Sequence, residues 1–402
     1  MKILQVIPYF YPALQYGGPI SVVMGLSRAL AQKGHHVTVA TTTANGASEL
    51  EVTTNTVLKM DNFEIIYFKR LRWERVFAAI PYLGQSVGFF YSPGLLDYLL
   101  REVQSFDVVH VHEIFCYPAI IAAKIARQKK IPYVVHVHSV LNPIRFARRS
   151  LKKTIYMKLI GKKLLNSANG IIAVTKSESE DLANFKLTSD IGIIPNGTNY
   201  KRLDVSRKEY DDDIFGLGNK KLILFLGRLH LIKGIDLLID AYSIIAEKNP
   251  DSILVIAGPD EVGIQKDLVE KANTLNLSGQ IMFVGFVKGD EKEHLLRRCD
   301  VFALTSYSEV LGVANLEALS YAKPIVITEG CNFDDVEAYS AGFINPPEAN
   351  AIAKSLDTIL NNSDLRRRMG ENARNLIKEK YTWDTVAEKT LAFYNRAFVS
   401  KA

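Results

Sequence analysis

The sequence predicts an α/β protein of two Rossmann-like domains, each with a parallel sheet between helices. Short apolar runs alternate with helical patterns along most of the chain, as in parallel α/β architecture. A polar run over 201–213 interrupts this alternation, which then restarts. At 402 residues the chain is long enough for two domains with complete cores. In such sheets ligands bind beyond the carboxyl ends of the strands and in the crevice between the halves.

The first half is expected to form one domain, residues 1–200. Its strands are predicted at Ile3–Ile7, 34–41, Glu64–Phe68, Asp107–Val111, Pro132–Val137, Gly170–Thr175 and 191–197. Its helices are predicted at Ser21–Lys33, Ala119–Lys129 and Ile155–Ala168.

The run 201–213 is interpreted as a solvated linker, with a metal site at its three consecutive aspartates as the alternative. The second domain then covers 201–382. Its strands are predicted at Lys221–Leu226, Ser252–Ala257, Ile281–Val284, Val301–Leu304 and 323–327. Its helices are predicted at Gly234–Lys248, Gln265–Leu275, Glu291–Cys299 and directly after Gly312.

Composition narrows the class of protein. The net charge of +6 fits an anionic ligand or an anionic membrane surface, and is too mild to indicate nucleic acid. The three cysteines are widely scattered, which argues against a disulfide framework or a zinc site. Met1-Lys2 leads directly into the first strand, so no signal peptide and a cytoplasmic location are expected. Glycine and proline interrupt the uncharged stretch Val76–Leu96, so a spanning helix is not expected there.

The stretch from Ser306 to Pro324 carries the strongest functional pattern. Glu309 lies in the loop after a buried strand, Gly312 opens the following helix, and Glu317 lies five residues into it. Free amides at a helix N-terminus attract phosphate, and glycine lets an anion approach. Eight helical residues span about 12 Å, the reach of a nucleotide-linked sugar. The alternative is a solvated glutamate before a helix and another on its face.

A second pattern follows the strand Lys221–Leu226. Arg228 and Lys233 lie five residues apart between Gly227 and Gly234. A planar guanidinium and a point charge at the end of a strand suit a diphosphate. Two surface cations near the start of a helix are the alternative.

The first half offers weaker signals. Gly17 and Gly18 lie between a strand and a helix, where the backbone can press against a ligand or simply turn. Two His-x-His pairs end neighbouring strands, at His110/His112 and His136/His138. Alternation places each pair on one face of the sheet, so a metal hydrolase is one hypothesis. Without matching Asp and Lys at other strand ends, we favour local hydrogen bonding, with His138 directed to the ligand.

Together these motifs resemble glycosyltransferase family 4, the retaining nucleotide-sugar enzymes of GT-B fold. The resemblance covers nearly the whole chain and adds Asn196-Gly197 at the domain junction. It implies two Rossmann-like domains facing across a crevice, an N-terminal acceptor domain, a C-terminal donor domain, and a segment 383–402 that returns to the first domain. It also implies a hexosyltransferase acting on a glycan or lipid-linked acceptor in bacterial-type surface polysaccharide or glycolipid synthesis, with no metal or other cofactor.

The resemblance assigns roles to individual residues. Arg228 and Lys233 would hold the donor diphosphate, Glu317 the ribose hydroxyls, Glu309 the donor sugar and His138 the transferred sugar. The backbone near the phosphates would come from Gly17, Gly18, Leu311, Gly312 and Val313. The chain departs from the family pattern at Val310-Leu311, where Gly-Phe is common, and at Thr198-Asn199, where Val-Asp is usual.

Other functions remain open from sequence. A nucleotide-sugar 2-epimerase shares the architecture but would convert its donor without an acceptor. The His-x-His metal hydrolase would carry bound metal. A non-catalytic nucleotide-binding protein is disfavoured, because both carboxylates and both cations are present.

One stretch predicts a membrane contact. Between Arg145 and Lys163 there are eight basic residues, no acidic ones, and apolar residues at helical spacing. A basic amphipathic helix of this kind can lie on an anionic bilayer. A packed helix with a solvated basic face is the alternative.

Overall fold

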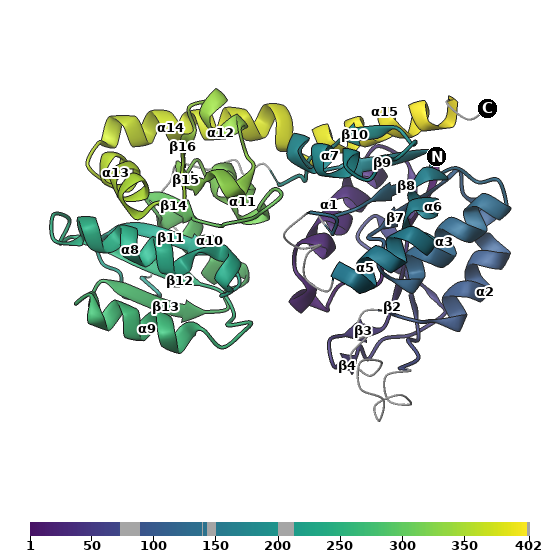
Figure 1. Ribbon diagram of the computed structural model, residues 1–402, viewed down its shortest axis with the longest axis horizontal. Coiled ribbons are helices and arrows are strands. Elements are labelled where there is room, and N and C mark those ends of the chain that lie inside the picture. Colours follow the sequence, from purple (N-terminus) through teal and green to yellow (C-terminus); the bar gives the residue numbers. More distant parts are fainter. Residues whose placement is uncertain (73–88, 139, 143–149, 200–212, 400–402) are drawn as a thin grey trace. The chain divides into compact units, whose positions relative to one another are not determined.

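The computed structural model describes residues 1–72, 89–138, 140–142, 150–199 and 213–399. The chain divides into two compact units, which are described separately below. Unit 1 comprises Met1–Gly197 and Trp383–Ala402, and unit 2 comprises Thr198–Thr382 (Figure 1). Each unit contains a largely parallel sheet with helices, so the predicted fold class is confirmed.

Unit 1 is built on an eight-stranded sheet in the order β10-β9-β8-β7-β1-β2-β6-β5. Only β5 runs antiparallel to its neighbour among these strands. A separate two-stranded sheet pairs β3 (Ala44–Asn45) with β4 (Ser48–Glu49). The strands of the main sheet are β1 (Lys2–Val6), β2 (His36–Thr42), β5 (Val57–Met60), β6 (Phe63–Phe68), β7 (Val108–His112), β8 (Tyr133–His136), β9 (Gly170–Ala173) and β10 (Ile191–Ile193).

The helices of unit 1 differ from expectation in their bounds and in their number. The helix expected over Ile155–Ala168 begins earlier and contains the π-helical segment Met157–Gly161. Strand β5 and helices α2 and α7 did not appear in the sequence prediction. The α-helices are α1 (Gly18–Gln32), α2 (Pro93–Glu102), α3 (Tyr117–Gln128), α5 (Ser150–Tyr156), α6 (Lys162–Asn166), α7 (Lys176–Ala183) and α15 (Trp383–Val399).

The last helix, α15, completes unit 1 although it follows unit 2 in the chain. Its aromatic side chains rest on glycines, where no Cβ intervenes. A Cβ on Gly25 would lie 2.0 Å from Trp383 Cε2, and one on Gly170 would lie 2.4 Å from Phe393 Cζ. Helix α15 therefore packs against α1 and the sheet at distances that only glycine permits.

Unit 2 has a six-stranded parallel sheet in the order β13-β12-β11-β14-β15-β16. The chain order reverses beside β11, so β12 and β14 flank it. The strands are β11 (Lys221–Leu226), β12 (Ser252–Ala257), β13 (Ile281–Gly285), β14 (Val301–Leu304), β15 (Ile325–Thr328) and β16 (Gly342–Asn345). The α-helices are α8 (Ile235–Ala246), α9 (Gln265–Thr274), α10 (Gly289–Arg298), α11 (Val313–Ser320), α12 (Asp335–Ala338), α13 (Ala349–Leu360) and α14 (Ser363–Leu376).

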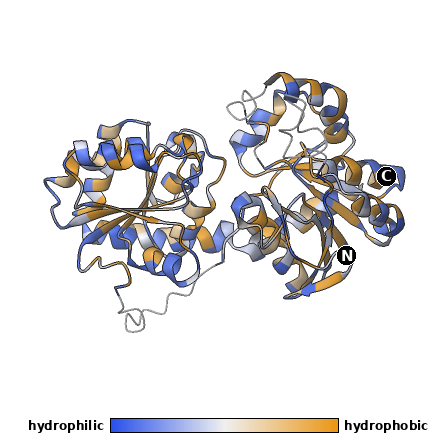
Figure 2. Cartoon of the chain, turned by 90° about the horizontal axis from the view of Figure 1, so that it is seen from below, coloured by the Kyte–Doolittle hydropathy of each residue, from blue (hydrophilic) through white to orange (hydrophobic). Residues whose placement is uncertain are grey.

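The core of each unit lies between its strands and helices. The strands are predominantly hydrophobic, and the helices turn hydrophilic residues outward (Figure 2). Fully buried strand side chains include Phe225 and Phe302 in unit 2.

Some sequence predictions fall outside the described residues. They are the greater part of the linker 201–213, residues 76–88 of the uncharged stretch, and residues 145–149 of the basic stretch. Among the residues that are described, no helix is both long enough and apolar enough to cross a bilayer.

Candidate functional site

The loop after β11 presents the two predicted cations. Strand β11 ends at Leu226, and Lys233 ends a short 3₁₀ helix, Leu231–Lys233, which His230 caps by accepting a hydrogen bond from the Ile232 amide at 3.1 Å. Gly234 then takes a left-handed conformation, φ 60°, before α8 begins. The turn at Gly234 therefore separates the end of the 3₁₀ helix from the start of α8.

This loop is joined closely to the loop after β14. A Cβ on Gly234 would lie 2.2 Å from the Thr305 carbonyl oxygen, so only glycine fits between the two backbones. The Thr305 hydroxyl donates to the Gly234 carbonyl at 2.7 Å, and the Tyr307 amide donates to the Ile232 carbonyl at 2.9 Å. Two neighbouring strand ends thus form one rigid edge.

Lys233 and Glu309 meet at this edge. Lys233 Nζ donates to Glu309 Oε2, and the side chains are only 14% and 12% exposed. The backbone of Glu309 is fixed as well, since its amide donates to Gly330 and its carbonyl accepts from Asn332. The structure therefore brings together two residues that sequence reasoning assigned to one ligand.

Arg228 makes a different contact. Its guanidinium donates to Glu261, which follows β12, and both side chains are well exposed. In a doubly wound sheet Arg228 could also face the start of the Gly312 helix, but its ion-pair partner Glu261 follows β12, which lies on the other side of β11 from β14. The two cations of this loop thus pair with two different carboxylates.

Helix α11 begins as predicted. Gly312 is its N-cap residue, Val313 its first residue and Glu317 its fifth, while Leu311 is buried just before it. A Cβ on Gly312 would lie 3.2 Å from Leu304 Cδ2, a tight contact. Glu317 is partly exposed and pairs with Lys292 of α10 at 2.7 Å.

Asn315 is a polar residue of this region that sequence reasoning missed. It is fully buried in the first turn of α11, and both polar atoms of its side-chain amide lack a hydrogen-bond partner within the described part of the chain. Buried polar groups are normally satisfied, so an orphaned amide beside Gly312 calls for a functional explanation. Its only sequence signal is one polar residue inside an otherwise apolar run.

In unit 1, Gly17 and Gly18 form the entry to α1. Gly17 has φ 77°, a left-handed conformation suited to glycine, and apart from its chain neighbours no described residue has an atom within 4 Å of its missing Cβ. Gly18 begins the helix, with Pro19 directly after it. The backbone here is open to a ligand.

The four histidines of the two His-x-His pairs gather into one buried cluster. Strands β7 and β8 are paired so that His112 lies opposite His136. The rings of His136 and His138 stack with centroids 3.8 Å apart, and those of His110 and His112 stack at 4.2 Å. Burial lowers the pKa of all four, to about 3 for His110 and His138, so the four imidazoles are neutral near pH 7.

A hydrogen-bond chain fixes the tautomers of two of these rings. Gln5 Nε2 donates to the Ser27 hydroxyl at 2.7 Å, so Gln5 Oε1 faces His112 Nε2, 2.9 Å away, as an acceptor. With the Gln5 amide in this orientation, His112 carries its proton on Nε2 and accepts through Nδ1 from His138 Nε2 at 2.9 Å. This leaves His138 Nδ1 unprotonated. His138 also has φ 49°, an uncommon conformation for a residue other than glycine.

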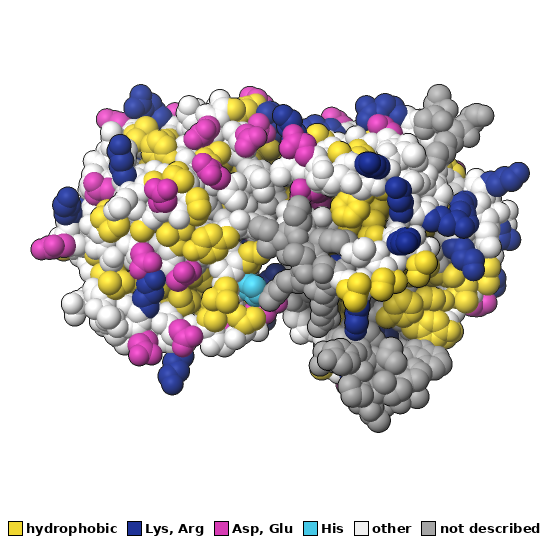
Figure 3. Space-filling model, viewed as in Figure 1, with side chains coloured by type: hydrophobic (Ala, Val, Ile, Leu, Met, Phe, Trp, Pro, Cys, Tyr) yellow, Lys and Arg dark blue, Asp and Glu magenta, His cyan; other side chains and the backbone are white. Residues whose placement is uncertain are grey.

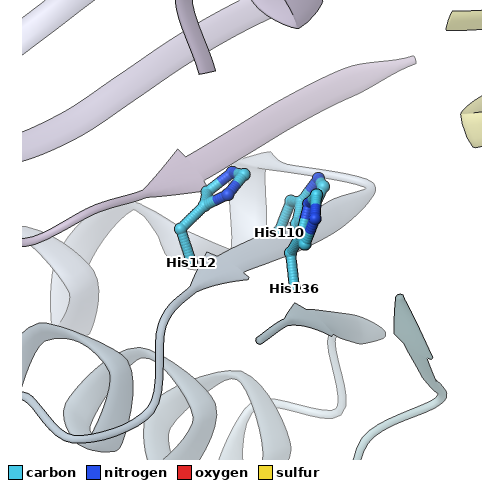
Figure 4. A group of neighbouring side chains, drawn as sticks. All are labelled: His110, His112 and His136. Atoms are coloured by element: carbon cyan, nitrogen blue, oxygen red, sulfur yellow. The ribbon is translucent and has the colours of Figure 1, made fainter. Parts of the chain in front are cut away.

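Part of the cluster could bind a metal ion. Ligand nitrogens of His110, His112 and His136 all lie within 4.8 Å of one another (Figure 4). His110 Nε2 and both ring nitrogens of His136 have no hydrogen-bond partner among the described residues. However, both nitrogens of His112 already bond to Gln5 and His138, and this group includes no carboxylate to balance the charge of a cation.

A polar and aromatic group beside the histidines also escaped sequence reasoning. Tyr9 follows β1, stacks on Tyr16 with ring centroids 3.9 Å apart, and donates to the carboxylate of Glu113. Glu113 follows β7 and, like His138, has a positive φ, 66°. Strained residues at the carboxyl ends of neighbouring strands are typical of ligand sites. No local sequence pattern distinguishes them.

Two family models match most of the chain. Residues 16–202 match "Glycosyltransferase Family 4", and residues 207–376 match "Glycosyl transferases group 1". The chain belongs to the family 4, group 1 glycosyltransferases, and it is a glycosyltransferase enzyme.

Individual relatives agree with this assignment. An uncharacterized glycosyltransferase of Methanocaldococcus jannaschii is 26% identical over 99% of this chain and 98% of its own length. The O-antigen chain mannosyltransferase C of Escherichia coli is 23% identical over the full length of both chains. The crystal structure of Anabaena HepE in complex with UDP and glucose superposes with a TM-score of 0.74 at 20% identity, covering 98% of this chain and 99% of that one. That likeness shows the GT-B fold.

Proposed function

We propose that this enzyme transfers a hexose from a nucleoside-diphosphate sugar to a glycan or lipid-linked acceptor, with retention of configuration at the transferred carbon. The observation that carries the proposal is the nearly buried Lys233–Glu309 pair at the edge formed by the β11 and β14 loops. A cation beside a carboxylate at a strand end suits a donor with a diphosphate on one side and sugar hydroxyls on the other. The chemistry fits a family whose members include a mannosyltransferase.

In this proposal different residues of unit 2 bind different parts of the donor. Lys233 keeps one hydrogen bond to Glu309 and directs its others to the diphosphate, because an ammonium has three donors. Arg228 leaves Glu261 for the diphosphate, an exchange between exposed partners that costs little. The amides after Gly312 add dipole stabilisation from the start of α11. Glu317 accepts from the ribose hydroxyls through the oxygen that Lys292 leaves open.

The reaction is driven by stabilisation of the leaving group. As the bond between sugar and diphosphate breaks, negative charge grows on the departing oxygen, and preorganised donors stabilise it. Glu309 orients the sugar hydroxyls. His138 Nδ1, left unprotonated by the hydrogen-bond chain to Gln5, is an acceptor for a hydroxyl of the transferred sugar.

Unit 1 supplies the acceptor side in this proposal. The stacked Tyr9 and Tyr16 rings and the Glu113 carboxylate provide an apolar surface and an acceptor, which suit a sugar. The likeness to an O-antigen chain mannosyltransferase supports a role in surface polysaccharide synthesis. Glycolipid synthesis and a cytoplasmic location are further parts of the proposal.

The proposed chemistry requires no cofactor or metal. Dialysis against a chelator should leave transfer unchanged, and metal analysis should find no stoichiometric zinc. Activity lost to the chelator and restored by zinc would instead support a metal at His110, His112 and His136.

The donor assignment is tested by comparing the activity and nucleotide binding of four alanine variants. Lys233→Ala and Arg228→Ala should each lower kcat/KM by about tenfold to a thousandfold, as loss of a leaving-group donor does. Glu317→Ala should weaken binding of free nucleoside diphosphate in calorimetry, whereas Glu309→Ala should reduce transfer with that affinity nearly unchanged. Lys266→Ala, an exposed position on α9, is the control. Thermal shift with UDP- and GDP-sugars identifies the donor first.

Near-normal turnover in both cation variants would overturn the diphosphate assignment. Loss of nucleoside diphosphate binding in Glu309→Ala, with binding retained in Glu317→Ala, would reverse the roles of the two carboxylates.

A further inference from the structure

A helical run on unit 1 exposes aliphatic side chains among cations. It consists of α5, the π-helical segment Met157–Gly161 and α6. Leu151 and Leu159 are 73% and 69% exposed, and Ile155 and Ile160 are also exposed. Large aliphatic side chains at this exposure are usually isolated on a surface, whereas four within ten residues form a patch.

The exposed residues share one side of the run. Leu151, Ile155 and Leu159 are spaced by four, which in a regular α-helix drifts by about 40° per step. The π-helical segment is more loosely wound, so it reduces that drift around Leu159. The opposite side is packed, since Met157, Leu164 and Leu165 are buried. The run therefore has a core face and a second apolar face that the described residues do not cover.

Cations surround this second face. Lys158, Lys162 and Lys163 are exposed, and none of them has an ion-pair partner among the described residues. The neighbouring helix α3 adds Lys124 and Arg127. Between Ile114 and Ser177 the sequence has thirteen Lys and Arg and no Asp or Glu.

A shallow groove joins the two helices at this face. Its lining is mainly apolar, with Ile120, Leu159 and Ile160 among its residues, and Lys124, Arg127 and Lys163 also line it. Figure 3 views unit 1 from the side on which Figure 1 draws α3, α5 and α6 in the foreground. Lys and Arg side chains stand there among hydrophobic ones.

We propose that this face, made by α3, α5, the π-helical segment and α6, is a docking surface for an anionic lipid bilayer. Cations attract the anionic headgroups, and the aliphatic side chains enter the boundary between headgroups and acyl chains. Charge complementarity alone would also admit nucleic acid. Protruding Leu and Ile do not serve phosphate recognition, which uses cations and polar groups, whereas they gain by entering lipid. The inference is independent of the proposed sugar transfer.

Vesicle sedimentation with the full-length protein tests this surface. One set of vesicles contains three parts phosphatidylcholine to one part phosphatidylglycerol, and the other contains phosphatidylcholine alone. We expect binding to the first set that weakens as salt is added, because exposed charges are screened, and little binding to the second.

Two variants separate the contributions of charge and apolar contact. Lys158→Ser/Lys162→Ser/Lys163→Ser should reduce partitioning to anionic vesicles by about a hundredfold, because each surface cation contributes about fivefold. Leu151→Ser/Leu159→Ser should reduce it by at least tenfold with no change in charge. Both alter exposed side chains, so circular dichroism and the melting temperature should remain those of the wild type.

The controls carry matched changes elsewhere. Lys266→Ser/Lys354→Ser/Lys378→Ser removes three exposed lysines from unit 2, and Val57→Ser/Ile244→Ser removes two exposed aliphatic side chains away from the face. Both controls should bind vesicles like the wild type. The proposal is overturned if the lysine variant and its control lose binding equally, or if the Leu variant binds unchanged. Binding to a structured RNA without binding to anionic vesicles would overturn it as well.

Discussion

At the residue scale, the buried histidines show how ordinary groups acquire a defined chemical state. His138 has its proton position set by a chain through His112 to Gln5 and Ser27. Each link is a single hydrogen bond, worth about 1 kcal/mol, but an incorrect tautomer would leave a buried group unpaired at a cost of about 1–3 kcal/mol. Gln5 is therefore a positioning residue for His138.

The hydrogen-bond chain from His138 through His112 to Gln5 predicts a spectroscopic effect of substituting Gln5. In the wild type, ¹⁵N shifts should show His138 protonated at Nε2 and unprotonated at Nδ1. Gln5→Leu removes the acceptor for His112 Nε2, so both His112 and His138 should become tautomer mixtures, and transfer should fall. The His110 signals serve as an internal control, because that ring bonds to Tyr394. Unchanged His138 shifts in the variant would show that Gln5 does not set its tautomer.

Burial of the histidines also predicts how stability depends on pH. Their pKa values are lowered in the folded chain, so below pH about 6.5 the unfolded state binds protons that the folded state does not. The free energy of unfolding should therefore fall as the pH drops from about 6.5 towards 4. His136→Leu removes one such group and should reduce that slope by about 1.4 kcal/mol per pH unit in denaturant titrations. Equal slopes for variant and wild type would show that protonation of His136 in the unfolded state does not contribute to this pH dependence.

At the element scale, the edge formed by the loops after β11 and β14 depends on how closely these two loops approach each other. Gly234 and Gly330 are both positions where a Cβ would meet a neighbouring carbonyl, Thr305 in the first case and Ser306 in the second. The first contact holds the 3₁₀ helix before α8 against the loop that carries Glu309, and the second holds the segment after β15 against the same loop. The placement of Lys233 beside Glu309 follows from backbone packing as much as from their charges.

Gly234→Ala tests this packing. The new Cβ would need a left-handed backbone and would collide with Thr305, so we expect a loss of about 2–4 kcal/mol in stability and of transfer activity. Gly263→Ala is the matched control. Gly263 also has positive φ, 78°, but beyond its chain neighbours none of the described residues comes within 4 Å of its missing Cβ, so the variant should lose only about 1–2 kcal/mol. Similar losses in the two variants would show that the close approach is unimportant.

At the scale of the whole molecule, one helix ties the end of the chain to its beginning. Helix α15 belongs to unit 1 and buries Phe393 and Tyr394 there, with the Tyr394 hydroxyl 2.7 Å from His110 Nδ1. Unit 1 is therefore incomplete until α15 has been synthesised. The same helix contributes to the histidine cluster.

We predict that Phe393→Ala destabilises unit 1 selectively. The ring is almost fully buried over Gly170 and Gly192, so its loss should cost about 3–5 kcal/mol. Hydrogen exchange should accelerate in β9 and β10, with α8 and β12 of unit 2 unaffected. Phe398→Ala, at a partly buried position of the same helix, should have a smaller effect. Uniform acceleration through both units would argue against a separate role for α15 in unit 1.

Local sequence patterns were sufficient to predict the strands and helices in which apolar residues recur at a regular spacing. The alternation of apolar runs and helical periods gave the two parallel sheets, and β11, β12 and β14 begin and end where the sequence placed them. The start of α11 after Gly312 was likewise predictable, because glycine after a buried strand is a local signal. Strand β5 and helix α7 are short, and helix α2 begins inside the uncharged stretch Val76–Leu96, so none of the three was predicted.

Only the tertiary structure decided which side chains meet. The Lys233–Glu309 pair, the orphaned amide of Asn315, the grouping of Tyr9 with Glu113 and the stacking of four histidines all join residues from different elements. A doubly wound sheet would allow Arg228 to face Gly312, whereas in the folded chain its guanidinium pairs with Glu261. Such contacts depend on strand order and on backbone approach at particular glycines. A one-dimensional pattern contains neither, because both arise from packing between segments far apart in the chain.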